Sequence, residues 1–416
     1  MLVIMRLSLA ALAALWALLP CASAAADGMD QSLTPAVARV AVPAAAQTAQ
    51  TGGWLVAARI AVPGRSTYLE SISAAGAGDV WSAGVSAAQG GRTVRLLIER
   101  KSGGRWRPVA VPEPLARKFQ AGQAGRLAFA LIRASSAGNV WVFNQETGAF
   151  LRWDGRQWSE GSVPAPPGDA LAVTSALVLG HCDVWAFGAT VGAKGGELPF
   201  AARFSGHSWH VVSLPRTAGP LVSAASAASR QDIWVTIGFA GQLAFPASGS
   251  GGSLLHWNGR RWEPVPLPAV LADGGDPTSV VAVSDHDVWV GGGAPDLKPG
   301  GLAGMSARWN GRTWHISRLP QPASSGQCVL SSILPGRRAG LLALDLCFAE
   351  GGPSMTSQFW DLASGHWTGP ARPRLTGPAP VLLSMSPAGP HGTAWAAGFA
   401  GEAAIVAVHA LRQARQ

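Results

Sequence analysis

The chain has little charge, little cysteine and almost no tyrosine. Only 13% of its 416 residues are charged, and it contains 4 cysteines and 1 tyrosine, Tyr68. So few cysteines exclude a small scaffold held together mainly by disulfides. After Ala24 no apolar run is long enough to form a membrane-spanning helix, so we expect none in the mature chain. With 48% hydrophobic residues, the chain can instead build a large core.

Basic runs, metal-ligand spacings and catalytic motifs are also missing. The formal net charge is +9, but the arginines are scattered and no stretch has the basic footprint of a nucleic-acid binder. No nucleophile elbow, glycine-rich phosphate loop or calcium loop is present. We therefore expect no nucleic-acid partner, no cofactor and no metal. The histidines beside the repeated tryptophans are expected to be hairpin residues: His207, His210, His256, His315 and His366.

The chain does contain a repeat. Trp257–Pro268 reads WNGRRWEPVPLP, in which Asn258-Gly259 separates two short strands. An Asn-Gly pair there predicts a hairpin with a two-residue type I′ turn, because that turn needs positive φ at both central residues. A hairpin that recurs at a fixed period of about 50 residues indicates a propeller or a solenoid. The second Trp recurs at Trp54, Trp106, Trp158, Trp209, Trp262, Trp314 and Trp367, spaced by 52, 52, 51, 53, 52 and 53 residues.

A second motif precedes each hairpin. It reads Asp-Val-Trp at Asp79–Trp81 and Asp287–Trp289, and the sixth unit has Leu341–Leu344 in its place. With the apolar run before it, each unit holds four short strands, which we call a to d, and four strands per unit describe a propeller blade. Further copies of the motif are Asn139–Trp141, Asp183–Trp185, Asp232–Trp234 and the weaker Thr393–Trp395.

The ends of the repeat region complement each other. Gly53–Pro63 has the pattern of strand d alone, whereas Ser384–Leu411 has the pattern of strands a, b and c. The N-terminal strand can therefore complete the last blade and close the ring. The sequence predicts an all-β fold, a seven-bladed β-propeller of four-stranded blades spanning residues 53–411, and we expect a monomer.

The segment before the propeller has the pattern of an export signal. Arg6 precedes an apolar run at Leu7–Leu19, and small residues follow at Ala22–Ala24. Residues 1–24 are therefore predicted to be a signal peptide, residues 25–52 a flexible leader and residues 412–416 a tail. The protein is expected to be secreted or extracytoplasmic. Lipoprotein anchoring through Cys21 is the alternative, which the preceding Pro20 disfavours.

Two cysteines flank strands a and b of the sixth unit. Cys328 and Cys347 would lie opposite one another on antiparallel strands, so we predict a disulfide in an oxidising compartment. This unit also lacks the Asp-Val-Trp motif, and the disulfide would offset its weaker packing. Cys182, next to the third Asp-Val-Trp motif, is expected to be a small buried residue.

The repeated tryptophans and arginines are expected to be structural. A Trp at one position of every blade most simply packs between neighbouring blades. Trp257 and Trp309, which end a strand beside the turn, are expected to be partly exposed. Arginines beside these tryptophans are expected to stack on indole rings. They are Arg152, Arg156, Arg260, Arg261, Arg308 and Arg312.

Any functional site is expected on one face of the ring. The a–b and c–d turns are short and regular, whereas the b–c and d–a connections are long and variable, such as Phe187–Ala202 and Glu113–Leu127. Irregular loops on a rigid scaffold are the usual carriers of binding sites. Within them, Asp273, Asp276 and Asp296 could meet and are the candidate ligand-binding residues. Turn-forming and solubilising roles remain the competing interpretation of these three acids.

The Trp-Asn-Gly hairpins resemble those of secreted bacterial propellers of the kelch-like, galactose-oxidase-like or Asp-box type. Trp309–Trp314 is similar to an Asp-box turn, but it lacks the Ser and has Asn for Asp. The resemblance implies the fold and an exported location and does not imply a reaction. Galactose oxidase would require two tyrosines at a copper site, and Tyr68 is alone.

Two functions remain open from the sequence. The first is an exported, non-catalytic propeller that binds a glycan or protein partner through its variable loops. The alternative is a carbohydrate-active hydrolase or lyase that uses acids at the channel mouth. A structural cell-envelope protein without a small ligand is a third interpretation.

Overall fold

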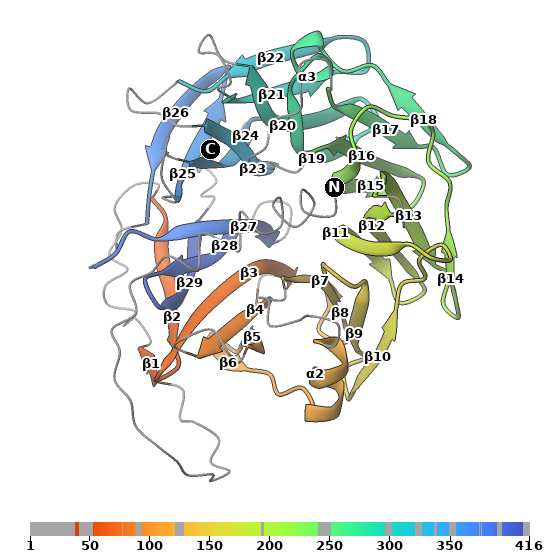
Figure 1. Cartoon of the computed structure of the whole chain (residues 1–416). Helices are drawn as coiled ribbons and strands as arrows, with labels where there is room; N and C mark the ends of the chain where they lie inside the picture. Colours follow the sequence, from red (N-terminus) through yellow and green to blue (C-terminus); the bar gives the residue numbers. More distant parts are fainter. Residues whose placement is uncertain are drawn as a thin grey trace.

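The computed structural model describes residues 38–40, 53–76, 78–88, 94–120, 129–192, 195–239, 251–295, 302–320, 327–336, 339–348, 355–373, 375, 377–388 and 393–410. Seven antiparallel sheets follow one another around a ring (Figure 1). The seven-bladed propeller is therefore confirmed. The first strand of each blade, strand a, lies nearest to the centre of the ring.

The blades follow the repeat units in order. Blade 1 holds β3 (Arg65–Gly76), β4 (Asp79–Ala88), β5 (Val94–Ser102) and β6 (Arg105–Pro108); blade 2 holds β7 (Ala130–Ser136), β8 (Asn139–Asn144), β9 (Ala149–Trp153) and β10 (Trp158–Ser162). Blade 3 holds β11 (Ala170–Gly180), β12 (Asp183–Val191), β13 (Glu197–Phe204) and β14 (Trp209–Val211); blade 4 holds β15 (Leu221–Ser229), β16 (Asp232–Gly238), β17 (Ser253–Trp257) and β18 (Trp262–Val265). Blade 5 holds β19 (Asp276–Ser284), β20 (Asp287–Pro295), β21 (Leu302–Trp309) and β22 (Trp314–Arg318); blade 6 holds β23 (Gln327–Pro335), β24 (Leu341–Phe348), β25 (Met355–Ala363) and β26 (His366–Ala371).

Blade 7 closes the ring as the sequence predicts. It holds β27 (Val381–Ala388), β28 (Thr393–Ala400) and β29 (Ala403–Ala410), and β2 (Leu55–Ala61) pairs antiparallel with β29. The hydroxyl of Thr67, in blade 1, accepts a hydrogen bond from the N–H of Ala404 at 3.0 Å. Within the predicted leader, β1 (Ala38–Val40) pairs with β2 as a fifth strand.

Serine hydroxyls join the inner strands of neighbouring blades. The hydroxyl oxygen of Ser73 in β3 accepts the N–H of Ala134 in β7 at 2.9 Å. Four further bonds of this kind join Ser71 to Ile132, Ser175 to Ala225, Ser226 to Ala282, and Ser386 to Ala74. Each is worth about 1 kcal/mol in net stability. These bonds give the ring a polar connection at its inner edge, in addition to the apolar contacts between blades.

The repeated tryptophans pack between blades, as predicted. Trp185 of blade 3 lies among Val222, Ile233 and Leu255 of blade 4, and Trp289 of blade 5 lies against blade 6 in the same way. Trp309 is partly exposed, as expected. The expectation for Trp257 is wrong, because Trp257 is only 9% exposed and packs edge-on against Trp185.

Beside these tryptophans, Asp, Trp and Arg form a recurring unit. In blade 1, Arg100 makes two hydrogen bonds to Asp79, at 2.7 and 3.0 Å, and its guanidinium lies 4.6 Å from the ring centroid of Trp81. The predicted stacking is confirmed for Arg152 over Trp141 and for Arg308 over Trp289. In blade 4 a histidine replaces the arginine, and His256 stacks on Trp234. Arg261, by contrast, pairs with Glu263.

The predicted type I′ turn is wrong for the Asn-Gly hairpins. Trp257 pairs with Trp262, so four residues form the loop, and among the described non-glycine residues only Ala339 and Ser364 have positive φ. The Asn258 carboxamide oxygen accepts the N–H groups of Arg260 and Arg261, which stabilises this longer turn. Two-residue turns with positive φ at both residues occur instead in blades 1 and 6, at Gly103-Gly104 and at Ser364-Gly365.

The variable connections contain more regular structure than expected. The segment 113–127, predicted to be irregular, begins with helix α2 (Glu113–Phe119), and a second helix, α3 (Ala269–Ala272), follows Pro268. Pro112 precedes α2, acidic Glu113 lies in its first turn and basic residues in its last, an arrangement that stabilises a short helix. Strands b and c also extend into segments predicted as loops. No helix in the described part of the chain is long and apolar enough to cross a membrane.

Candidate functional site

The three predicted acids have different environments. Asp273 is exposed at the C-terminal end of α3. Asp276, at the start of β19, is 5% exposed, and its carboxylate accepts the N–H of Phe239 at 2.8 Å. It therefore connects blade 5 to the b–c segment of blade 4. Asp296 lies outside the described residues. A ligand-binding role for these residues remains a prediction.

A pocket lies at the face that carries the b–c and d–a connections, which we call the loop face. Its volume is about 300 Å³, at the small end of the range for small-molecule sites. Arg216 and Thr217 line it from the connection between blades 3 and 4, and the ends of β17 and β18 supply the rest. The buried hydroxyl of Thr217 has no hydrogen-bond partner in the described structure. The remaining lining residues are Gly252, Ser253, Leu254, Pro264, Val265, Pro266 and Leu267.

The pocket combines apolar walls with a few polar groups. Ser253 is held in place because its hydroxyl bonds both the N–H and the carbonyl of Ala218, at 2.9 and 3.1 Å. The carbonyl of Pro266 accepts the indole N–H of Trp314 from blade 5 at 2.8 Å. Arg216 is exposed at the rim. A rigid wall of prolines beside an arginine and an unpaired hydroxyl can bind a polar ring or a short polar chain.

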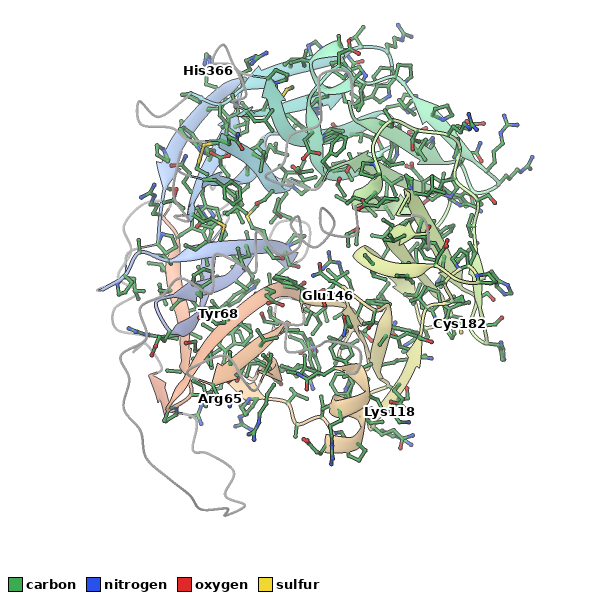
Figure 2. The ribbon with its side chains drawn as sticks, in the orientation of Figure 1. Arg65, Tyr68, Lys118, Glu146, Cys182 and His366 are labelled. Atoms are coloured by element: carbon green, nitrogen blue, oxygen red, sulfur yellow. A yellow bond between two sulfur atoms is a disulfide. The ribbon has the colours of Figure 1, made fainter. Side chains whose placement is uncertain are left out.

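A second set of polar residues lies at the inner edge of blades 1 and 2. Glu70 in β3 accepts the N–H of Ala130 in β7 at 2.8 Å. Burial raises the pKa of Glu70 to about 8; the Ala130 N–H lowers it in part, and the negative charge of Glu146 raises it further. Figure 2 shows Glu146 close to the centre of the ring. Glu70 therefore holds its proton at neutral pH next to a second carboxyl group.

Arg133 makes hydrogen bonds to residues of three blades at the same inner edge. Its Nε donates to the carbonyl of Ala176 at 3.1 Å, and its Nη1 donates to the hydroxyl of Ser71 and the carbonyl of Ile132. Burial lowers the pKa of its guanidinium to about 10, so it stays charged at neutral pH. Among the described residues no carboxylate forms an ion pair with it. The guanidinium is thus fixed in position by neutral groups.

Sequence reasoning missed Glu70, although the repeat contains a signal for it. Strand a of six blades has a β-bulge, and the extra residue is Thr174, Ser223, Thr278, Ser331 or Leu383 in five of them. In blade 1 it is Glu70. Thr174 and Thr278 use their hydroxyls to bond the next blade. A carboxyl group at this position departs from the repeat, which marks it as a functional candidate.

The cysteines give one confirmation and one correction. Cys328 and Cys347 form the predicted disulfide. The expectation for Cys182 is wrong: it is a free, exposed cysteine in the a–b turn of blade 3, on the outer part of the ring (Figure 2). The motif that follows it buries Val184 and Trp185, but the turn itself extends into solvent.

No protein-family model and no curated protein matches the chain. Solved structures do resemble it. A PL25 ulvan lyase bound to -[GlcA(1-4)Rha3S]- has a TM-score of 0.52 at 12% identity, over 84% of this chain and 92% of that chain. A Mycobacterium tuberculosis puromycin-hydrolyzing peptidase has a TM-score of 0.51 at 14% identity, over 83% of this chain and 52% of that chain. YCF48 bound to D1 peptide has a TM-score of 0.44 at 14% identity, over 89% and 98%. At these identities the likeness to the lyase and to the peptidase shows the propeller fold alone.

Proposed function

We propose that this chain is an exported, non-catalytic propeller that binds a glycan or protein partner through its loop face. The pocket at the loop-face end of blade 4 is the observation that supports this proposal. It offers the Arg216 guanidinium, the unpaired hydroxyl of Thr217 and a wall that includes Pro264 and Pro266. Hydroxyl-rich ligands suit such a mixed lining, so a glycan is the ligand to test first.

The rigid ring supports a binding role. The closing strand and the serine bonds between blades hold the ring together, and the Ser253 hydroxyl fixes the segment at Ala218 beside the pocket. A ligand that meets a preformed site loses less free energy to ordering of the protein. The disulfide agrees with an extracytoplasmic location. Export and kinship with kelch-like or Asp-box-like propellers are part of the proposal.

The test is a glycan-array binding assay on the mature chain, paired with an assay for product release from the same polysaccharides. We expect binding without release. The Arg216→Ala variant should weaken the binding about tenfold, because one rim arginine is lost. Arg312→Ala, on the opposite face, is the matched control and should bind like wild type. Equal binding by both variants would exclude this pocket as the glycan site. The absence of binding to any glycan on the array would favour a protein partner.

The alternative function is a carbohydrate-active hydrolase or lyase, and one observation favours it. A protonated Glu70 beside Glu146 offers a proton donor and a second carboxyl group, the pair that glycoside hydrolysis commonly uses. The fold likeness to an ulvan lyase is compatible with this alternative and does not decide between the two functions. Release of products in the assay above, abolished by Glu70→Gln and kept by Glu113→Gln, would establish it.

A further inference from the structure

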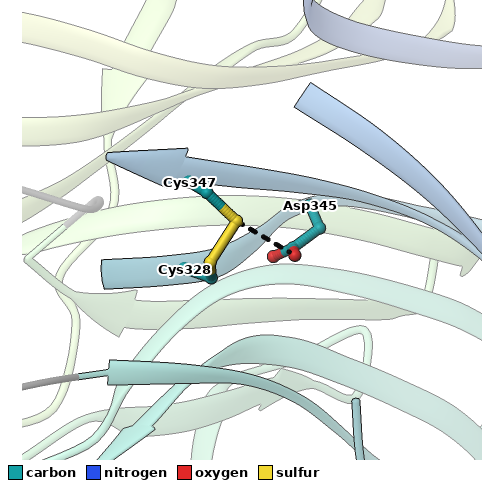
Figure 3. Close-up of side chains that lie close together, drawn as sticks. All are labelled: Cys328, Asp345 and Cys347. Carbon is teal, nitrogen blue, oxygen red and sulfur yellow. Dashed lines mark hydrogen bonds between the residues drawn. A yellow bond between two sulfur atoms is a disulfide. The ribbon is translucent and has the colours of Figure 1, made fainter. Parts of the chain in front are cut away.

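The disulfide of blade 6 has a buried carboxyl group next to it. Cys328 is the second residue of β23 and Cys347 is the penultimate residue of β24, so they pair directly at the loop-face end of the blade. Asp345 lies two residues before Cys347, on the same side of β24, and Figure 3 shows its carboxyl group facing the disulfide. Its Oδ2 is 3.4 Å from the Cys347 Sγ. A carboxyl oxygen and both sulfurs lie within 4.8 Å of one another.

The surroundings of Asp345 are uncharged. The residue is 1% exposed, and one carboxyl oxygen, Oδ1, has no hydrogen-bond partner. The other accepts the amide N–H of Gln358 in β25 at 3.2 Å. From blade 5, Gly304 covers the carboxyl group, and a Cβ at that position would lie 3.1 Å from Oδ1. Burial raises the pKa of Asp345 to about 7, and the polar groups of Gln358 and Trp360 lower it in part.

The position of Asp345 departs from the repeat. It pairs with Leu330, the residue just before the bulge of strand a. Four blades have glycine at the equivalent place in strand b, where a Cβ would come within 2.2 Å of a backbone carbonyl oxygen. An acid here is therefore not required by the architecture, and it coincides with the single disulfide of the described residues. The four glycines are Gly84, Gly188, Gly292 and Gly398.

We propose that the Cys328–Cys347 disulfide is a thiol-exchange site for a dithiol reductant, with Asp345 as its general acid. A reductant thiolate attacks the Cys347 Sγ, because Cys347 is partly exposed whereas Cys328 is only 5% exposed. The sulfur–sulfur bond breaks and its electron pair moves to Cys328. Asp345, whose carboxyl oxygen lies within 4.8 Å of both sulfurs, protonates the new Cys328 thiolate. A buried thiolate without a cation nearby is costly, so this proton speeds the step.

The second half of the exchange completes the balance. The second thiol of the reductant, as thiolate, attacks the reductant sulfur that is bonded to Cys347. The oxidised reductant then leaves with an intramolecular disulfide. Cys347 departs as a thiolate and takes a proton from solvent, and Asp345 is reprotonated from solvent. Two electrons have then passed from the dithiol to Cys328 and Cys347 through the bonds exchanged at sulfur. The dithiol has released two protons to solvent, and the two cysteines have taken up two, one of them through Asp345. The reverse sequence reoxidises the site.

The test measures reduction by dithiothreitol in the full chain carrying Cys182→Ser, with alkylation and mass spectrometry as the readout. We expect a rate proportional to the dithiothreitol concentration. Asp345→Asn should lower it about 100-fold at pH 6, and Asp361→Asn, a carboxylate of the same blade, should leave it unchanged. The rate per reductant thiolate should fall as the pH rises through 7, because Asp345 loses its proton.

Three results would overturn the proposal. One is an unchanged rate and pH profile in Asp345→Asn. The second is a rate that does not depend on the dithiothreitol concentration, which would show that reduction waits for unfolding. The third is a reduction rate per reductant thiolate that does not change with pH in the Cys182→Ser protein. This result needs no Asp345 variant, so it holds even if that variant does not fold.

Discussion

Blades 5 and 6 are neighbours that fill the same positions with different chemistry. The strand registers place Leu342 of blade 6 where blade 5 has Trp289, and Asp361 where it has Arg308. Blade 5 therefore has the Asp–Trp–Arg unit at its turn end, whereas blade 6 has a disulfide and a buried acid at its loop end. A four-stranded blade can thus be stabilised at the turn end of strand b, by the Asp–Trp–Arg unit, or at its loop end, by a disulfide.

The difference also separates two kinds of residue. Trp289 and Arg308 have counterparts around the ring: Trp289 packs against the next blade, and Arg308 holds Asp287 and Trp289 within its own blade. Asp345 occurs once, where other blades have glycine or another residue, and it lies next to a bond that can be reduced and reformed. Departures from the repeat are therefore the positions at which we look for function.

The largest effect is expected from Trp289→Ala. The side chain is buried against Leu330, Leu341 and Trp360 of blade 6, and its removal leaves a cavity between two blades. We expect a loss of about 3–5 kcal/mol in the free energy of unfolding. The counterpart Leu342→Ala should cost less, because it removes fewer buried atoms. Urea denaturation of both variants checks this, and a larger loss for Leu342→Ala would contradict the comparison.

The next effect depends on pH. The pKa of Asp345 is raised to about 7 in the folded protein, so folding favours the protonated form. This stabilisation is complete below pH 4 and is lost as the pH rises toward 7. Relative to wild type, the free energy of unfolding of Asp345→Asn should therefore rise by up to about 4 kcal/mol between pH 4 and pH 7. Parallel denaturation curves across this range measure the gain, and a constant difference would disprove the shifted pKa.

Removal of the disulfide should have the third largest effect. The bond closes a loop with a sequence separation of 19. The double variant Cys328→Ser/Cys347→Ser should lose about 3 kcal/mol by the chain-entropy model. The matched control Cys182→Ser, in an exposed turn, should be close to wild type. Oxidised samples are compared by urea denaturation, and equal stability of all three proteins would refute a stapling role.

The smallest effect is expected from Asp287→Asn in blade 5. The Asp287 and Arg308 side chains are 26% and 33% exposed, so solvent weakens their ion pair. We expect a cost of about 0.5–1 kcal/mol that shrinks as salt is added. The stacking of Arg308 on Trp289 is retained in this variant. Thermal unfolding at low and high ionic strength measures the change, and a cost independent of salt would indicate lost packing instead.

The sequence predicted the ring because its signals are local and repeated. Tryptophans spaced by 51 to 53 residues and a turn in each hairpin are enough to fix seven blades and the closing strand. The Cys328–Cys347 pair followed from the same register. The turn type could not be predicted in this way, because the Asn258 side chain stabilises a four-residue loop that competes with the two-residue turn.

The candidate site was harder to predict because it depends on three-dimensional register. Glu70 is the extra residue of a bulge in strand a, Asp345 pairs with the residue before such a bulge, and a bulge has no clear sequence signal here. The pocket around Arg216 forms where three separate segments meet. Asp276 was assigned to a variable loop, whereas it begins β19, and its carboxylate accepts a backbone N–H that the sequence does not reveal.

The closing strand has a consequence for how the molecule is made. β2 is synthesised early, but its partner β29 ends at Ala410, and the Thr67–Ala404 bond spans 337 residues. The first strand of the ring must therefore wait for its partner in blade 7 until nearly the whole chain has emerged. Such long-range pairing slows folding, because loop closure costs entropy before the contact forms. The ring is completed as a late, single event, and until then the edges of the first and last blades are open to pairing with other chains.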